Sequence, residues 1–208
     1  MNKGFFLTLE GVEGTGKSTL TRLLSADLER DGFPFITTRE PGGSSIGKIV
    51  RSLILDASSP DLTPKAEALL FAADRSQHVH EVIRPALEAG KVVICDRYSD
   101  SSAAYQGFGK GLGDEEVRRL SLWGTDSLMP NLTILIDLDP TVGISRKSEE
   151  EYNRMEAQDI EFHQKIREAF LDMAQGDPRF FIIDGTLSLE TVYGLAKEEL
   201  YFRINNRH

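Results

Sequence analysis

A short glycine-rich run near the start of the chain has the residue types and spacing of a phosphate-binding loop. Residues 11–18 match the pattern G-x-x-x-x-G-K-[ST] at every fixed position. Glycines let backbone N–H groups turn toward phosphate oxygens, and the N-terminus of a following helix adds positive potential. In such a loop Lys17 reaches the β- and γ-phosphates of ATP, and the hydroxyl of Ser18 binds Mg²⁺. We expect the Lys17 side chain to lie at the surface of the loop. The predicted ATP-binding residues are Gly11, Val12, Glu13, Gly14, Thr15, Gly16, Lys17 and Ser18.

A carboxylate suited to a metal ion follows a later apolar run. Residues 92–95 are all apolar, and Asp96 and Arg97 come directly after them. The carboxyl end of a strand beside the phosphate loop is where a Mg²⁺-organising carboxylate belongs. We therefore expect Ser18 and Asp96 to hold Mg²⁺. Asp137 also closes an apolar run and is an alternative metal ligand. A purely structural pair between Asp96 and Arg97 is the alternative to a metal role for Asp96.

A regulatory GTPase is the first alternative class that the phosphate loop allows. Such a switch should carry D-x-x-G at the end of one strand and N-K-x-D on a later one. Here residues 96–99 read Asp-Arg-Tyr-Ser, and residues 137–140 read Asp-Leu-Asp-Pro. Neither GTPase motif is in place, and the length of the chain excludes a large motor ATPase. The sequence therefore favours a small metabolic phosphotransferase.

Apolar runs of strand length alternate along the chain with segments of helical periodicity. The runs predict strands at 5–9, 35–38, 92–95, 132–138 and 180–183. The periodic segments predict helices at 17–30, 46–55, 114–125, 160–174 and 189–200, and a helix that starts at 63–64, runs past 73 and has a second piece ending near 90. Alternation of this kind predicts a parallel sheet covered on both faces. The expected fold class is α/β, a three-layer α/β/α P-loop NTPase fold with a five-stranded parallel sheet.

Length and composition limit the class of protein further. The chain has 208 residues, 40% of them hydrophobic, so residues 1–208 can form one full-sized domain. A formal net charge of -9 argues against a nucleic-acid polymer as partner, because such binding depends on Lys and Arg that neutralise phosphates. The single cysteine, Cys95, excludes an intramolecular disulfide. With no visible signal peptide and no run of about 18 apolar residues, we expect a cytoplasmic protein that does not enter a membrane.

Four short blocks of the chain resemble those of bacterial thymidylate kinases. Residues 39–43 are similar to the R-E-P-G-G signature, and residues 70–75 resemble the L-F-x-A-x-R helix. Residues 96–98 and 104–107 resemble D-R-[YFH] and A-Y-Q-G. The blocks follow the order and spacing of the family, and the resemblance covers essentially the whole chain. It implies a homodimer that transfers the γ-phosphoryl group of ATP to dTMP, giving ADP and dTDP for dTTP synthesis.

The resemblance also implies which residues bind dTMP. Arg39 and Arg97 would bind its phosphate as planar, bidentate donors. In the family, the residue matching Phe71 stacks on thymine and the one matching Arg75 bonds the base edge; four residues apart, they share a helix face. Core packing is the alternative for Phe71. The implied dTMP-binding residues are Arg39, Arg51, Phe71, Arg75, Arg97, Ser102, Tyr105 and Gln106.

Two further residues match family positions near the acceptor sugar. Tyr105 resembles the tyrosine that lies under the sugar, where its ring would collide with a ribose 2′-hydroxyl. Glu13, inside the phosphate loop, matches a carboxylate near the same sugar; the alternative is a solvated loop acid.

A segment after the fourth predicted strand is expected to form a mobile lid. The bacterial branch lacks an arginine in the phosphate loop and supplies positive charge from a lid, which here corresponds to about residues 146–156. Residues 154–156 resemble the family pattern D-R-x-E, although Asn153 replaces the usual aspartate. Surface ion pairs with the glutamates at 149–151 are the alternative for these arginines. The predicted catalytic residues are Lys17, Arg97, Arg146, Arg154 and Glu13.

Two alternative functions remain open from the sequence. The nearest is another nucleoside monophosphate or deoxynucleoside kinase of the same fold. The other is a P-loop binding module without catalysis. The four histidines show no metal-ligand pattern, Cys95 is expected to be a small buried strand residue, and Trp123 is expected in the core or at a subunit interface.

Overall fold

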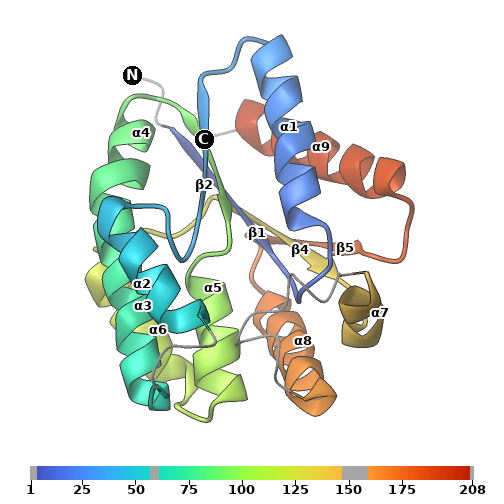
Figure 1. The fold of residues 1–208 in the computed structure, drawn as a ribbon. Coiled ribbons are helices and arrows are strands. Elements are labelled where there is room, and N and C mark those ends of the chain that lie inside the picture. The colour runs from blue at the N-terminus through green and yellow to red at the C-terminus, as the bar shows by residue number, and fades with distance from the viewer. Residues whose placement is uncertain (1–3, 57–60, 147–158, 207–208) are drawn as a thin grey trace.

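A single parallel sheet organises the molecule. The computed structural model describes residues 4–56, 61–146 and 159–206, and within these ranges the strands pair in the order β2-β3-β1-β4-β5 (Figure 1). The predicted five-stranded parallel sheet is confirmed, and each strand ends within one residue of its predicted end. The strands are β1 (Phe5–Glu10), β2 (Phe35–Arg39), β3 (Val92–Asp96), β4 (Leu132–Asp137) and β5 (Phe180–Asp184).

Helices cover both faces of the sheet, which gives the three predicted layers. On one face lie α1 (Lys17–Arg30) and α9 (Leu189–Asn205) (Figure 1). The other described helical segments are α2 (Ser45–Leu55), α3 (Pro64–His78), η1 (Val79–Ile83), α4 (Arg84–Glu88), α5 (Ser99–Ser102), η2 (Ala103–Gly109), α6 (Asp114–Gly124), α7 (Pro140–Ser145) and α8 (Ile160–Ala174). None of the helices within the described ranges is long and apolar enough to cross a membrane.

The apolar core is divided by the sheet. Leucines of α1 and aliphatic residues of α9 pack with one set of strand side chains, among them Leu7 and Ile94. On the other face, Phe6, Val93 and Cys95 pack with η1 and α4. Strand residues alternate between the faces because successive side chains point to opposite sides. Cys95 is therefore the buried strand residue that the sequence predicted.

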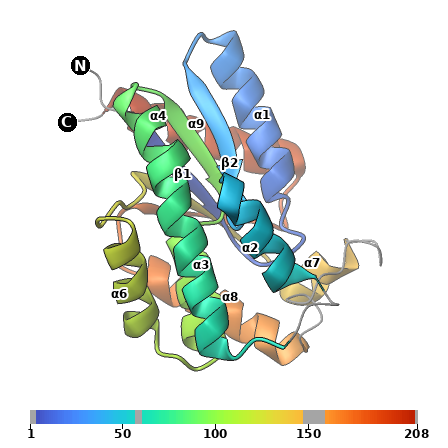
Figure 2. The ribbon, with the colours of Figure 1, turned by 60° about the vertical axis from the view of Figure 1, so that its left-hand side comes forward.

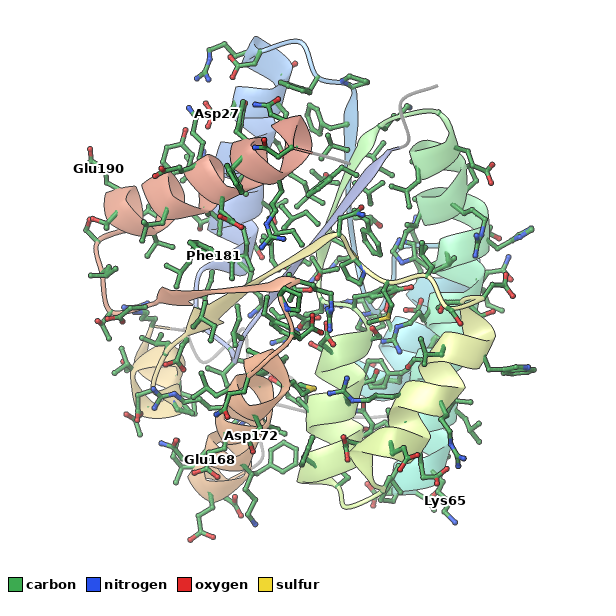
Figure 3. The ribbon with its side chains drawn as sticks, turned by 180° about the vertical axis from the view of Figure 1, so that it is seen from behind. Asp27, Lys65, Glu168, Asp172, Phe181 and Glu190 are labelled. Carbon is green, nitrogen blue, oxygen red and sulfur yellow. The ribbon has the colours of Figure 1, made fainter. Side chains whose placement is uncertain are left out.

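Helix α9 is held against α1 by polar contacts at the rim of the core. Asp27 of α1 lies beside α9 (Figure 3) and accepts hydrogen bonds from Tyr193 and from Lys197, the latter at 3.0 Å. Phe181 of β5 packs beneath the same helix (Figure 3). The layer therefore supports the sheet, and only the N-terminus of α1, at Lys17 and Ser18, reaches the cavity.

Three features of the fold differ from the prediction. The helical segment α5–η2 and helix α7 were not predicted, because their serine- and glycine-rich sequences lack a strong helical signal. Helix α9 continues to Asn205, five residues beyond the predicted end at 200. Trp123 is 83% exposed on α6, which excludes the core and leaves the subunit interface of its two predicted places.

Candidate active site

The phosphate loop joins β1 to α1, as the sequence predicted. Gly14 has a φ of +72°, and a Cβ added there would lie 1.9 Å from the backbone oxygen of Gly143 in α7. Only glycine fits this position, because both the conformation and the space exclude a side chain. The loop is thereby locked against the segment that follows β4.

Lys17 is folded back over this loop. Its ammonium group donates to the backbone oxygens of Gly11 (3.0 Å) and Val12 (2.8 Å) and to Thr15 Oγ1 (3.1 Å). Lys17 is only 7% exposed, so the expected surface position is wrong. Burial, with the charge of Arg97, lowers the pKa of Lys17 to about 8. The ammonium group is thus hydrogen-bonded to three acceptors of the loop, which phosphate oxygens can replace.

The two residues expected to hold Mg²⁺ contact each other beside the loop. Ser18 Oγ donates to Asp96 Oδ2 at 3.1 Å. Asp137, the alternative ligand, accepts two hydrogen bonds from Arg167 at 2.6 and 2.9 Å. Asp96 is therefore the carboxylate in contact with the loop hydroxyl, whereas Asp137 is committed to an arginine. No cluster of three or more His, Cys, Asp or Glu suited to a metal occurs among the described residues.

Arg97 occupies a strained turn directly after β3. Its φ of +72° is uncommon for a residue with a side chain. Glu10, at the end of β1, accepts hydrogen bonds from the backbone N–H of Tyr98 (2.8 Å) and from Ser101 Oγ (2.6 Å), and so holds this turn. Burial and the nearby Asp100 raise the pKa of Glu10 to about 7. No pattern in the sequence singled out Glu10, because a strand-end acid usually faces solvent.

The side chain of Arg97 reaches the loop through Glu13. Its guanidinium donates to Glu13 Oε1 and to Ser101 Oγ, both at 3.0 Å. The Tyr105 hydroxyl donates to Glu13 at 2.7 Å, and His163 Nδ1 lies 3.5 Å from the carboxylate. Although burial opposes the charged form, Arg97 and His163 hold the pKa of Glu13 well below its usual range. Glu13 is thus a fixed anion, unlike a solvated loop acid.

Arg75 is held rigidly at the opposite end of the site. Its guanidinium is buried and donates to Glu40 Oε2 (2.8 Å), Ser121 Oγ (2.9 Å), the Tyr98 backbone oxygen (3.2 Å) and Ser102 Oγ (2.9 Å). These contacts use four of its five N–H groups. Such a guanidinium is pre-organised and can offer a ligand one further donor.

Glu40 also contacts His78. His78 Nδ1 lies 2.9 Å from Glu40 Oε1, and its Nε2 lies 2.6 Å from Thr38 Oγ1. Glu40, which follows Arg39 in the 39–43 block, thus holds both Arg75 and His78 of α3. No pattern in the sequence indicated a role for either residue.

One cavity of about 650 Å³ is lined both by the phosphate loop and by Arg75. It lies at the carboxyl ends of β1, β2 and β3, where ligands bind in open α/β sheets. Phe71 is half-buried and lines it; the residue belongs to none of the core clusters. Gly11, Val12 and Thr15 lie in the loop outside its lining, and Arg154 lies outside the described residues. The predicted site residues that line it are Glu13, Gly14, Gly16, Lys17, Ser18, Arg39, Arg51, Phe71, Arg75, Asp96, Arg97, Ser102, Tyr105, Gln106 and Arg146.

Comparisons with known proteins agree on one family. The family model described as thymidylate kinase matches residues 9–194. A thymidylate kinase from Bifidobacterium longum (strain DJO10A) is 48% identical over 201 residues, which cover 95% of this chain and 97% of the relative. One from Pelobacter propionicus is 43% identical over 212 residues, covering 98% and 97%. The crystal structure of thymidylate kinase from Ehrlichia chaffeensis superposes with a TM-score of 0.78 at 29% identity, covering 95% of this chain and 99% of that one.

Proposed function

The chain belongs to the thymidylate kinase family, whose reaction is the transfer of a phosphoryl group from ATP to dTMP, and we propose that both nucleotides bind in the 650 Å³ cavity. The protein is a phosphotransferase that gives ADP and dTDP, and the comparisons do not favour another kinase of the same fold. One observation carries the proposed site: the phosphate loop and the Phe71–Arg75 face of α3 line the same cavity.

The proposed mechanism is alignment of two phosphates with compensation of their charge. Loop N–H groups and Lys17 bind the ATP phosphates, and Arg39, Arg51 and Arg97 bind the phosphate of dTMP. Arg39 is exposed at the end of β2, and Arg51 Nη1 donates to the Pro41 backbone oxygen at 2.9 Å. Little covalent chemistry is needed from the protein, because positioning and electrostatic stabilisation account for most phosphoryl-transfer catalysis.

The loop hydroxyl and Asp96 suit Mg²⁺. Ser18 and Asp96 offer hard oxygen donors 3.1 Å apart. Mg²⁺ is usually held by one or two such groups together with substrate phosphates and waters, so a larger carboxylate cluster is not required. When bound, the ion would neutralise charge on the ATP phosphates. In this proposal Ser18 and Asp96 orient it, while Lys17 and Arg97 act on the phosphates directly.

The lid is proposed to complete the site. Arg146 lines the cavity, and its Nη2 donates to the Gly185 backbone oxygen at 3.4 Å. Arg154 lies outside the described residues, as does the rest of the expected lid from 147 to 156. We assign both arginines to the transferring phosphoryl group, within a single domain of residues 1–208.

Phe71→Ala is expected to raise KM for dTMP about tenfold or more, because stacking on an aromatic ring is worth roughly 1–3 kcal/mol per base. KM for ATP should stay within about twofold. The measurement is steady-state kinetics with each substrate varied, with Phe202→Ala, an exposed phenylalanine on α9, as the control. Normal kinetics combined with a melting temperature many degrees lower would restore core packing as the role of Phe71, since a buried Phe→Ala change costs about 3–5 kcal/mol.

Tyr105→Ala is expected to raise activity on ribothymidine monophosphate relative to dTMP roughly tenfold, or ~1.4 kcal/mol. The buried ring lies edge-on to Phe162 and Phe170, and its hydroxyl is held by Glu13, so it has a fixed position under the proposed sugar site. Tyr105→Phe keeps the ring and should keep the deoxy preference. The ratio of kcat/KM values for the two nucleotides is the measurement. An unchanged ratio in the alanine variant would place the discrimination elsewhere.

We also propose that the protein is a homodimer in the cytoplasm. Helices α2, α3 and α6 lie together on one side of the molecule (Figure 2). They expose the large apolar side chains Ile49, Leu69 and Trp123, which supports the subunit-interface alternative for Trp123. The one cysteine is buried and unpaired, as suits a reducing compartment. ATP and dTMP are the proposed partners, with no nucleic-acid polymer.

A further inference from the structure

The base end of the cavity lies between two rows of side chains. Helix α3 carries Glu67, Phe71 and Arg75 at intervals of four residues, so they share one face. Segment α5–η2 carries Ser102 and Gln106 at the same interval. Two hydrogen bonds of 2.9 Å join the rows, from Arg75 Nη2 to Ser102 Oγ and from Gln106 Nε2 to Glu67 Oε1. Phe71 stands one turn from each bond and lines the cavity.

Glu67 is a buried anion with a compensating charge. It is 1% exposed, and Lys110 donates to its Oε2 at 2.5 Å. The side chain of Lys110 is 18% exposed and so keeps contact with solvent. A buried carboxylate is tolerated when it is paired and hydrogen-bonded. Gln106 and Lys110 together provide those contacts for both oxygens of Glu67.

The carboxylate determines which way the Gln106 amide faces. A glutamine amide has a donor end and an acceptor end, whereas a carboxylate only accepts. Gln106 must therefore turn its NH₂ group toward Glu67, and its Oε1 faces away from that residue. Among the described residues this buried oxygen has no hydrogen-bond partner, although Gln106 lines the cavity. Buried acceptors are costly when unpaired, so the arrangement points to a donor on the ligand.

The orientation of this amide has a chemical consequence for base recognition. Thymine and uracil carry an N–H at ring position 3 and a carbonyl at position 4. Cytosine carries a bare nitrogen and an amino group there. A fixed acceptor at Gln106 beside a fixed donor at Arg75 matches the N–H and carbonyl of thymine and uracil. The same two groups do not match the bare nitrogen and amino group of cytosine. Sites built to hydrogen-bond a substrate reject analogues that leave their polar groups unpaired.

We propose that Glu67, supported by Lys110, is a positioning residue that holds the Gln106 carbonyl toward the cavity and so selects a pyrimidine with an N–H at position 3. The inference rests on the proposed placement of the base at this end of the cavity. Glu67 acts only through Gln106 and touches no substrate.

The test compares dTMP with 5-methyl-dCMP, which share the methyl group, sugar and phosphate and differ only at positions 3 and 4. In the Glu67→Gln variant, Lys110 donates to the oxygen of the new amide, and the NH₂ group of that amide faces Gln106. The Gln106 amide therefore rotates so that its oxygen accepts from this NH₂ group and its own NH₂ group faces the cavity. The ratio of kcat/KM for dTMP to that for 5-methyl-dCMP should fall at least tenfold, with KM for ATP unchanged. Lys110→Arg keeps a positive charge beside Glu67, and with it the carboxylate as acceptor, so it should leave the ratio within about twofold of wild type, which corresponds to ~0.4 kcal/mol.

Two further variants separate positioning from folding. Gln106→Leu should lower the ratio by itself, and Glu67→Gln added to it should change the ratio no further, because both act through one amide. Replacing both Glu67 and Lys110 by methionine removes the ion pair as a unit, which proteins often tolerate, and should lower the ratio as Glu67→Gln does. Melting temperatures verify that each variant is folded.

If the ratio of the two kcat/KM values stayed at the wild-type level in both Glu67→Gln and the double methionine variant, the role of Glu67 would be overturned. An equal further fall when Glu67→Gln is added to Gln106→Leu would overturn it as well. A wild-type enzyme with no preference for dTMP over 5-methyl-dCMP would instead overturn the placement of the base, and this inference with it.

Discussion

Lys17→Ala is expected to lower kcat about 10²–10³-fold, the usual cost of removing one donor that stabilises charge in the transition state. Lys17 belongs to the loop that binds the ATP phosphates in the proposed site. Its ammonium group is held by Gly11, Val12 and Thr15 at 2.8–3.1 Å, so it is already close to the position that phosphate oxygens would occupy. Single-turnover and steady-state rates at saturating ATP and dTMP measure the effect.

The three contacts of Lys17 require a check on folding. Removing the ammonium group also removes hydrogen bonds that order the loop, so circular dichroism and the melting temperature accompany the kinetics. Lys165→Ala, which changes an exposed lysine of α8, is the matched control and should leave kcat unchanged. A folded Lys17→Ala variant with more than about a tenth of the wild-type kcat would be inconsistent with the phosphate role, since a tenfold loss is only ~1.4 kcal/mol.

Replacement of either arginine proposed for the lid is expected to have an effect at least as large. Arginine placed against a transferring phosphoryl group is worth about 10³–10⁵ in kcat. The phosphate loop has Gly14 and Thr15 where an arginine would otherwise lie, so Lys17 is its only cation. Arg146→Ala or Arg154→Ala should therefore lower kcat by ~10³ or more, while equilibrium binding of ATP changes little.

The two variants also test the surface ion-pair alternative. An exposed pair with the glutamates at 149–151 would be worth about 0–1 kcal/mol and would barely affect the rate. Arg203→Ala, on α9 away from the cavity, removes an arginine bonded to Glu199 and serves as the control. If both lid variants stayed within about threefold of wild type, under ~1 kcal/mol, the compensating charge would have to come from Arg97 or another arginine of the acceptor site.

The sheet and the phosphate loop could be predicted because their signals are local. Buried parallel strands appear as continuous apolar runs, and the loop has a fixed pattern of glycine, lysine and serine. The capping of α3 was visible for the same reason: Thr63 Oγ1 accepts from the Ala66 N–H at 3.2 Å, and Pro64 occupies the first helical position.

The polar network behind the site could not be predicted, because it depends on distant contacts. Glu67 meets Gln106 across 39 residues of chain, and Glu10 meets Ser101 across 91. A glutamate on a helix or at a strand end resembles a surface residue until its partner is known. The burial of Lys17 was missed for a related reason, since its acceptors are backbone oxygens of its own loop and have no sequence signature.

A coupled assay of ADP release with a panel of nucleoside monophosphates tests the preference of the enzyme for dTMP. With ATP and Mg²⁺ fixed, kcat/KM is determined for dTMP, dCMP, AMP and GMP. We expect dTMP to be the preferred acceptor by a wide margin, because the cavity joins the phosphate loop to the proposed base site, where Arg75 would donate and Gln106 would accept. Equal or greater activity on dCMP, AMP or GMP would contradict the thymidylate assignment, even though the chain would remain a P-loop kinase.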